Sequence, residues 1–332
     1  MIKQNEHTMP KSTLSALIKQ HKTSMIQYAG LLFVVVFFSI LTGGQIFSAY
    51  NLRTLVGQTA PLMITCVGVI FMFTNGSMDI ASGAVGGLCA MAAALVLNAT
   101  GSLLLAMVVS IAISVTLYLF SAFVSIKFGL ISTIASLAVM FMARGLVTYV
   151  CSLMPSTVIG LDNYDLVNAF KNNTALQVVL MVVVAATCWV LFSFTKIGKH
   201  ARAVGDNPVS AEQNGVQNSK IKMICALIAG LCVGVVAIFL LARAGSVSKN
   251  IGSGMEMDVM VAMILGGMAL SGGSKSKFSA AIIGPLTFRL LSNGMTMAGV
   301  PTGYVSLIRG IIFLVIVFAT LRQNKTIRAM PR

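Results

Sequence analysis

Residues 196–222 read KIGKHARAVGDNPVSAEQNGVQNSKIK, a long polar segment between two strongly apolar runs. Its small residues, such as Ala203 and Ala211, its turn sequence GDNP at 205–208 and the glycine at 215 predict a short amphipathic helix. Its lysines and arginine lie next to the apolar runs, which marks the cytoplasmic side of a membrane protein. A helix presented there is a surface for a cytoplasmic partner, although an ordinary solvated connector explains the same charges equally well.

The composition around this segment is that of an integral membrane protein. Hydrophobic residues make up 57% of the 332 residues and charged residues only 9%, whereas soluble domains are about one quarter charged. The net charge of +15 comes from cations in short loops and tails, so it indicates topology and not a nucleic-acid-binding face. The six cysteines lie in or beside apolar runs without CxxC spacing, which predicts buried thiols and neither disulfides, a metal site nor a cofactor.

The apolar runs predict an all-α polytopic membrane protein with about ten transmembrane segments. The predicted parts are a cytoplasmic tail at 1–24 with an interfacial helix at 12–22, a single transmembrane domain at 25–321 and a cytoplasmic tail at 322–332. The runs are 25–41, 55–73, 80–97, 103–126, 131–150, 175–194, 223–241, 258–270, 278–291 and 303–321. Because two of these runs are short, broken or re-entrant helices are expected.

Charge gives the predicted orientation. Sixteen of the 23 lysines and arginines fall in the tails and in the loops on the same side, so both termini are predicted to be cytoplasmic. Four cations fall in the predicted external segments, namely Arg53, Lys171, Arg243 and Lys249. Three more, Arg144, Arg289 and Arg309, fall within or near spans, where we expect them to bond a carbonyl or to extend toward an interface.

Two glycine-rich segments interrupt the apolar runs and resemble each other. GSMDIASG occupies 76–83 and GGMALSGG occupies 266–273, with Gly, Met and Gly in register. Paired interruptions favour a transporter of two pseudo-repeated halves with its pathway at their interface, and close helix packing through small residues is an equal alternative. The candidate pathway residues are Asn75, Gly76, Asp79, Gly83, Gly266, Gly267, Gly272 and Gly273.

Asp79 is an acid at or near membrane depth, where charge is costly and often functional. We expect it to stabilise the following helix as a first-turn acid within a broken helix. As a coupling acid it would instead make the chain a secondary transporter driven by an ion gradient. The three histidines lie in tails or loops without a partnering cysteine, so the sequence predicts no enzyme site.

Taken together, these motifs resemble the ribose-type permeases of bacterial ATP-binding cassette sugar importers. The polar segment matches G-x-x-x-x-A-x-G-x-N-x-x-x-A-x-x-x-G-V from Gly198 to Val216. The two glycine clusters are similar to that family's G-G-I-D-L-S-x-G and L-G-G-x-x-L-x-G-G segments. The resemblance covers roughly 55–321 in the same order. Departures from the family pattern, which bear on the substrate, are Ser77, Ala81, Ser210, Lys275 and Ser279.

The resemblance implies a subunit of the bacterial inner membrane that pairs with a second permease copy or a paralogue. A soluble binding protein would dock on the external loops at 155–171 and 243–256, and a separate ATPase would hold the segment at about 202–214. The sequence has no G-x-x-x-x-G-K-[ST] motif, so ATP would be hydrolysed by that other chain. The expected coupling residues are Arg202, Gly205, Asp206, Asn207, Ala211, Glu212 and Gly215.

Three functions remain open at this point. The first is import of a small neutral solute, for which a monosaccharide such as ribose suits a pathway nearly free of charge, and a nucleoside suits it almost as well. The second is ion-coupled transport through Asp79. The third is a membrane scaffold or channel without coupled transport. A neighbouring gene that encodes an ATPase with the phosphate-binding motif would favour the first over the other two.

Overall fold

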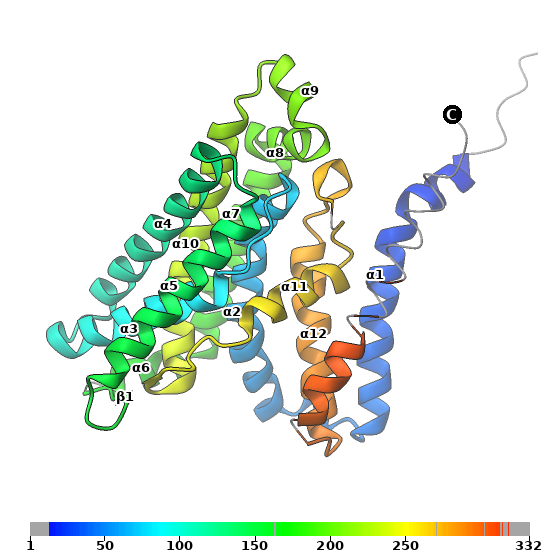
Figure 1. The fold of residues 1–332 in the computed structure, drawn as a ribbon. Coiled ribbons are helices and arrows are strands. Elements are labelled where there is room, and N and C mark those ends of the chain that lie inside the picture. Colours follow the sequence, from blue (N-terminus) through cyan, green and yellow to red (C-terminus); the bar gives the residue numbers. More distant parts are fainter. Residues whose placement is uncertain are drawn as a thin grey trace, which may run out of the picture.

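The computed structural model describes residues 13–162, 164–269, 271–301, 303–312, 314 and 318, with side chains from Gln27 onward. These residues are almost all helical (Figure 1). The predicted tail at 322–332, the first twelve residues and Leu270 of the second glycine cluster lie outside the described residues. The elements are α1 (Thr13–Leu41), η1 (Gln45–Phe47), α2 (Ala49–Thr74), α3 (Ser82–Thr100), α4 (Leu103–Lys127), α5 (Ser132–Ser152), β1 (Val158–Ile159), α6 (Tyr164–Asn172), α7 (Thr174–Phe194), α8 (Lys196–Asp206), α9 (Pro208–Gln213), α10 (Asn218–Ala244), β2 (Val247–Ser248), α11 (Met255–Leu265), η2 (Gly273–Lys275) and α12 (Ala280–Met297).

Six of the described helices are long and apolar enough to cross a membrane, namely α2, α3, α4, α5, α7 and α10. Shorter apolar helices at Gln27–Leu41 and Gly303–Ile312 lie on the first and last predicted runs, and α11 and α12 lie on the two short runs. Every predicted run therefore falls on a helix, which confirms an all-α polytopic membrane protein. The number of segments that cross the membrane stays a prediction.

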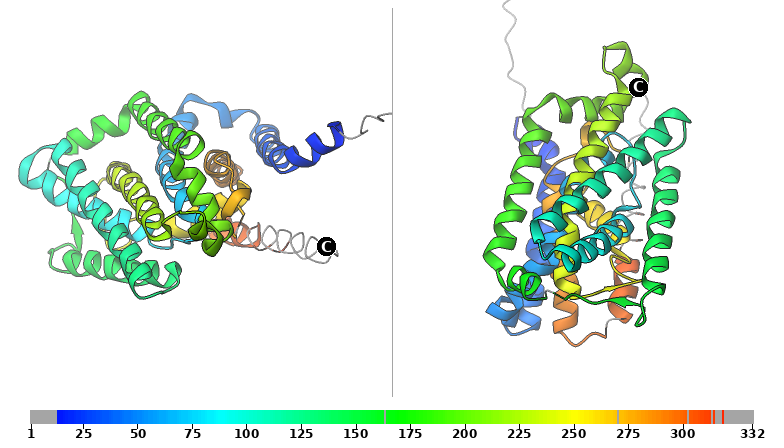
Figure 2. Two further views of the ribbon diagram at one scale, coloured as in Figure 1. Left: turned by 90° about the horizontal axis from the view of Figure 1, so that it is seen from above. Right: turned by 90° about the vertical axis from the view of Figure 1, so that its left-hand side faces the viewer.

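Helix α10 lies at the centre of the larger part of the bundle and packs against α2, α3 and α4 (Figure 2). Glycines allow this close approach, because a Cβ at Gly230 or Gly234 would overlap the backbone of Val115 or Ile111 in α4. All six cysteines are buried, four of them in or around this central group of helices. That location confirms the prediction of buried thiols.

Helices α1 and α12 pack against each other at one edge of the bundle (Figure 1). A small apolar cluster that includes Phe38, Met295 and Val305 joins them to the helix that begins at Gly303. The predicted helix at 12–22 is helical from Thr13 and continues without a break into the first predicted span, because Thr13–Leu41 is one helix, and its interfacial position stays a prediction. The chain from 13 to 29 contains no proline or glycine that would interrupt it.

The two predicted external loops are structured and joined to each other. Strands β1 and β2 pair antiparallel, with Val158 opposite Ser248. The prediction of 151–174 as a loop is incomplete, because it also contains α6, which buries Val167 and Phe170. This nine-residue helix is too short and too polar for its periodicity to be recognised in the sequence. Both loops lie at the end of the bundle opposite α8 and α9 (Figure 1).

Candidate functional site

Helices α8 and α9 form the polar segment and meet at Asn207. The Asn207 backbone is extended, and its Oδ1 accepts hydrogen bonds from the N–H groups of Val209 at 3.0 Å and Ser210 at 3.1 Å. This side-chain cap satisfies the first N–H groups of α9. The predicted helix is therefore two helices. Gly205 and Asp206 belong to the end of α8, and the chain bends one residue after them.

The two helices bury small side chains and expose polar ones. Figure 1 shows α9 extending beyond the ends of the long helices. Asn207 and Glu212 are exposed, and Val209 beside them is 66% exposed. Sequence reasoning missed Val209, although an apolar residue directly after Pro208 in a polar segment is a usable signal. The buried residues are Gly198, Ala201, Val204 and Ala211.

Arg202 faces the protein itself. Its guanidinium carbon lies 4.3 Å from the centroid of the Phe192 ring, which is fully buried at the end of α7. The Arg202 side chain is itself partly buried, and this burial lowers the pKa of its guanidinium from the ordinary value. The predicted contact of Arg202 with an ATPase stays a prediction, and the side chain also stabilises the position of α8 against α7.

Three backbone segments meet beneath α8. A Cβ at Gly205 would overlap the carbonyl oxygen of Thr74 and would lie 2.7 Å from the nitrogen of Gly273. Gly272 has a φ of +68° and packs in the same way against the carbonyl groups that end α2. The two glycine clusters predicted as a pair are therefore in direct contact. We call this contact the junction, formed by residues 73–76, 205–206 and 272–274.

Asp206 connects α8 to the second glycine cluster. Its Oδ1 accepts hydrogen bonds from the N–H of Ser274 at 2.9 Å and from the Ser274 hydroxyl at 3.1 Å. Because Asp206 ends α8 and Ser274 lies in η2, a displacement of α8 acts directly on the segment that joins α11 to α12. Sequence reasoning missed Ser274, because nothing local in GGSK indicates a partner 68 residues away.

The first glycine cluster separates α2 from α3. Helix α2 ends at Thr74, Gly76 takes a φ of +83°, and helical structure resumes at Ser82. Within this break the Oδ1 of Asn75 accepts from the Ser77 N–H at 3.1 Å, and the Ser77 hydroxyl accepts from Ser132 of α5 at 3.1 Å. The broken-helix prediction is confirmed here, and the break is bonded to a neighbouring helix.

Asp79 is buried in the same break. Its Oδ1 accepts from the Ala81 N–H at 3.0 Å and its Oδ2 accepts from the Tyr118 hydroxyl of α4 at 2.9 Å. Asp79 was expected to lie in the first turn of the following helix. This position is wrong, because Asp79 precedes Ser82, the first residue of α3. Its bonds have the structural character that was expected, since they hold the broken segment against α4.

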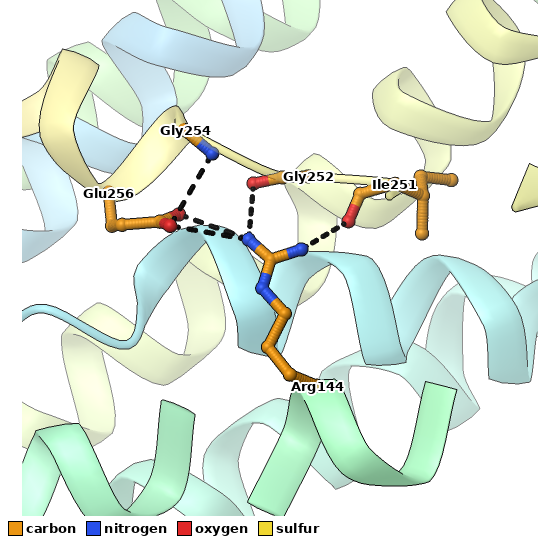
Figure 3. Close-up of polar contacts among 5 residues, drawn as sticks. All are labelled: Arg144, Ile251, Gly252, Gly254 and Glu256. Carbon is orange, nitrogen blue, oxygen red and sulfur yellow. Dashed lines mark hydrogen bonds and ion pairs between the residues drawn. The ribbon is translucent and has the colours of Figure 1, made fainter. Parts of the chain in front are cut away.

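Arg144 of α5 bonds the loop that precedes α11 (Figure 3). It donates to the carbonyl oxygens of Ile251 at 3.1 Å and Gly252 at 3.2 Å, and it contacts both carboxylate oxygens of Glu256 at 3.3 Å. The Glu256 carboxylate also accepts from the Gly254 N–H at 3.4 Å. The expected carbonyl contact is confirmed, and the ion pair with Glu256 was missed.

Asp258, in the same turn of α11, pairs with two arginines. Arg289 of α12 contacts one carboxylate oxygen at 3.1 Å, and Arg309 contacts the other at 3.4 Å. Both arginines are anchored to one acid, a partner that the expectation of a carbonyl contact or an interface did not include, and their depth in the membrane stays a prediction. The sequence did contain an indication of these ion pairs, because cations in apolar runs need counter-charges. Among the described residues, no group of histidine, cysteine and acidic side chains could hold a metal ion.

Most candidate pathway glycines lie in close contacts. A Cβ at Gly83 would overlap the Glu256 carboxylate, one at Gly266 the Ala280 carbonyl and one at Gly272 the Phe73 carbonyl. At Gly267 and Gly273 the overlapping atoms belong to the side chains of Gln27 and Asp206, whereas Gly76 faces open space. The alternative of close packing therefore accounts for these glycines, and a role in a pathway stays a prediction.

Comparison of the sequence with known proteins identifies a matching family and several relatives. The family described as branched-chain amino acid transport system / permease component matches residues 51–317. The ribose import permease protein RbsC of Escherichia coli strain K12 is 25% identical over 96% of this chain and 99% of its own length. The protein of that name from Bacillus subtilis strain 168 is 27% identical over 90% of this chain and 92% of its own.

A third relative is similar over a shorter region. The xylose transport system permease protein XylH of Haemophilus influenzae is 33% identical over 45% of this chain and 39% of its own length. No solved structure matches the chain.

Proposed function

The chain belongs to the family of branched-chain amino acid transport system permease components, and from this premise we propose that it forms the translocation path of an ATP-binding cassette importer. Membership in this family of permease components indicates a transport subunit that is embedded in the membrane. The importer class is supported by the ribose and xylose permeases to which it is similar, and by a relative named as a probable ABC transporter permease. An ATPase and an extracytoplasmic binding protein are the partners that this class implies.

The observation that carries the proposal is the junction. An importer subunit that cannot hydrolyse ATP must receive mechanical work at its cytoplasmic side and deliver it to its membrane-spanning part. Here α9 extends beyond the bundle with Asn207, Val209 and Glu212 exposed. One residue away, Asp206 bonds Ser274 in the break between α11 and α12. A partner that moves α9 therefore acts on both glycine clusters through the end of α8, where Gly205 and Asp206 contact them.

The proposed cargo is a small neutral solute, and a monosaccharide such as ribose is the first candidate. The ribose permeases align over nearly the whole chain. A relative named as an autoinducer 2 import permease also aligns, at 24% identity over 82% of this chain, so the aligned region does not by itself identify the cargo. Nucleosides remain the second candidate. The proposed location is the bacterial inner membrane with both termini in the cytoplasm, in a complex with a second permease chain.

Purification from the native host tests the importer class. We expect an ATPase and a binding protein to co-purify with the chain, and we expect the ATPase to be lost when residues 205–215 are replaced by a Gly/Ser linker. The solute that the binding protein retains identifies the cargo. Absence of any ATPase under conditions that preserve other such complexes would overturn the proposal and favour ion-coupled transport through Asp79.

A matched pair of variants then tests the junction. Asp206→Ala and Glu212→Ala each remove one exposed acid from the same segment, but only Asp206 bonds Ser274, directly after the second glycine cluster. We expect Asp206→Ala, which removes the acceptor oxygen, to retain the ATPase and to lose solute-stimulated ATP hydrolysis. Glu212→Ala should keep that stimulation once the ATPase is bound. Equal stimulation in the two variants would contradict the role of the junction.

A further inference from the structure

Three of the four cations on the predicted external side line one cavity. This cavity of about 420 Å³ is lined by residues of α2, α6, α7 and α10. The start of α2, α6 and the end of α10 lie at the end of the bundle opposite α8 and α9 (Figure 1). Arg53 comes from α2, Lys171 from the last turn of α6 and Arg243 from the last turn of α10. Three elements that are distant in sequence thus bring their cations to one place.

The cavity contains no acid to balance these charges. None of the residues that line it is acidic, and the remaining polar walls include Tyr50, Thr54 and Gln58. Within the described ranges, no ion pair joins any of the three cations to a carboxylate. The field of Asp258 reaches Arg243, but that carboxylate already bonds Arg289 and Arg309.

Three like charges around one cavity repel one another, so an anion that enters the cavity is attracted by all three. The predicted topology strengthens this argument, because lysines and arginines are few in the predicted external segments and numerous on the predicted cytoplasmic side. The site is therefore suited to an anion with several acceptor oxygens, such as a phosphate group.

The surroundings of the cavity select a lipid as the source of that phosphate. The cavity is lined by the first turns of α2, next to which the apolar side chains of Phe47 and Leu52 are exposed. Tyr50, which is 84% exposed at its rim, is an aromatic residue of the kind enriched at membrane–water interfaces. We propose that this cavity binds the phosphate headgroup of an anionic phospholipid, whose acyl chains lie against the exposed apolar residues at the start of α2. The proposal rests on no assignment of the transported solute.

Binding of a short-chain lipid to the delipidated full-length chain in detergent tests the proposal. We expect dihexanoyl phosphatidylglycerol to raise the unfolding midpoint, and dihexanoyl phosphatidylcholine and inorganic phosphate at equal concentration to leave it unchanged. In Arg53→Gln and in Arg243→Gln, the Kd for the phosphatidylglycerol should rise roughly fivefold for each cation removed. Lys249→Gln is the matched control, since it removes an exposed cation from the same predicted side but outside the cavity.

Several results would overturn the proposal. Stabilisation by inorganic phosphate to the same extent as by the lipid would assign the cavity to a soluble anion. Equal weakening by Lys249→Gln would reduce the effect to general surface charge. Binding that is unchanged in both arginine variants would exclude the cavity as the site. Because the two arginines lie on different helices, a folding defect in one variant leaves the other as the measurement.

Discussion

Replacement of Arg144 by methionine is the most informative single change, because this arginine holds α5 to the loop before α11. Its guanidinium bonds two backbone carbonyls and both oxygens of Glu256 (Figure 3). Methionine keeps much of the length and the apolar part of the side chain but supplies no donor or charge. The carboxylate of Glu256 would then be left without its counter-ion.

The expected cost follows from burial. The side chain of Glu256 is 11% exposed and that of Arg144 is 22% exposed. Breaking a fully buried pair by removing one partner costs about 3–5 kcal/mol. Because water reaches part of this pair and screens the remaining charge, we take the lower end, about 3 kcal/mol. A change of 1 kcal/mol shifts the unfolding midpoint of a large domain by about 2 °C, so we expect a decrease of about 6 °C.

Thermal unfolding in detergent measures this shift in Arg144→Met, in the double variant Arg144→Met/Glu256→Gln, and in Lys249→Met. The last variant is the control, since it removes an exposed cation. The double variant removes the uncompensated charge, so it should recover at least about 1 kcal/mol relative to Arg144→Met. A midpoint for Arg144→Met that equals that of the control would refute the reasoning, as would a double variant that unfolds earlier than Arg144→Met.

Three further changes test the other contacts. Asp258→Asn deprives two arginines of their shared counter-ion and should lower stability by about 3 kcal/mol; a thermal midpoint equal to that of the unsubstituted chain would contradict the pairing. Tyr118→Phe removes the hydroxyl that donates to Asp79 and should cost about 1–2 kcal/mol by the same assay, so an unchanged midpoint would show that the bond carries no net stability. Gly205→Ala places a Cβ against the Thr74 carbonyl and should reduce solute-stimulated ATP hydrolysis by roughly tenfold or more, while full stimulation with the ATPase bound would show that the junction does not transmit motion.

The helices could be predicted because each long apolar run has one solution inside a bilayer. A backbone at membrane depth must bond internally, so length and hydropathy together specify a helix. The breaks could be predicted as well, since glycine and polar residues interrupt the runs at 76–83 and 266–273. What these local patterns predict is where a helix stops, and the structure confirms both stops.

The partners across the fold could not be predicted, because they depend on which helices lie side by side. Arg144 is 112 residues from Glu256, and Asp206 is 68 residues from Ser274. A lone sequence shows that a cation within an apolar run needs a counter-charge but does not identify it. The short helix α6 was missed for a different reason, since nine residues give too few turns for a periodic signal.

The few acidic residues of this chain form several of its polar contacts between distant elements. The chain has only 8 acidic residues, and four of them bond groups on other elements or breaks: Asp79, Asp206, Glu256 and Asp258. An acid away from water is costly unless a donor is fixed beside it. Asp206 is exposed, but Asp79, Glu256 and Asp258 are largely shielded from water, so each of these three carboxylates favours the arrangement that supplies its donor, whereas a glycine only permits close approach. In a membrane chain this poor in acids, a shielded acid is therefore a stronger guide to the contacts between helices than the glycine motifs beside it.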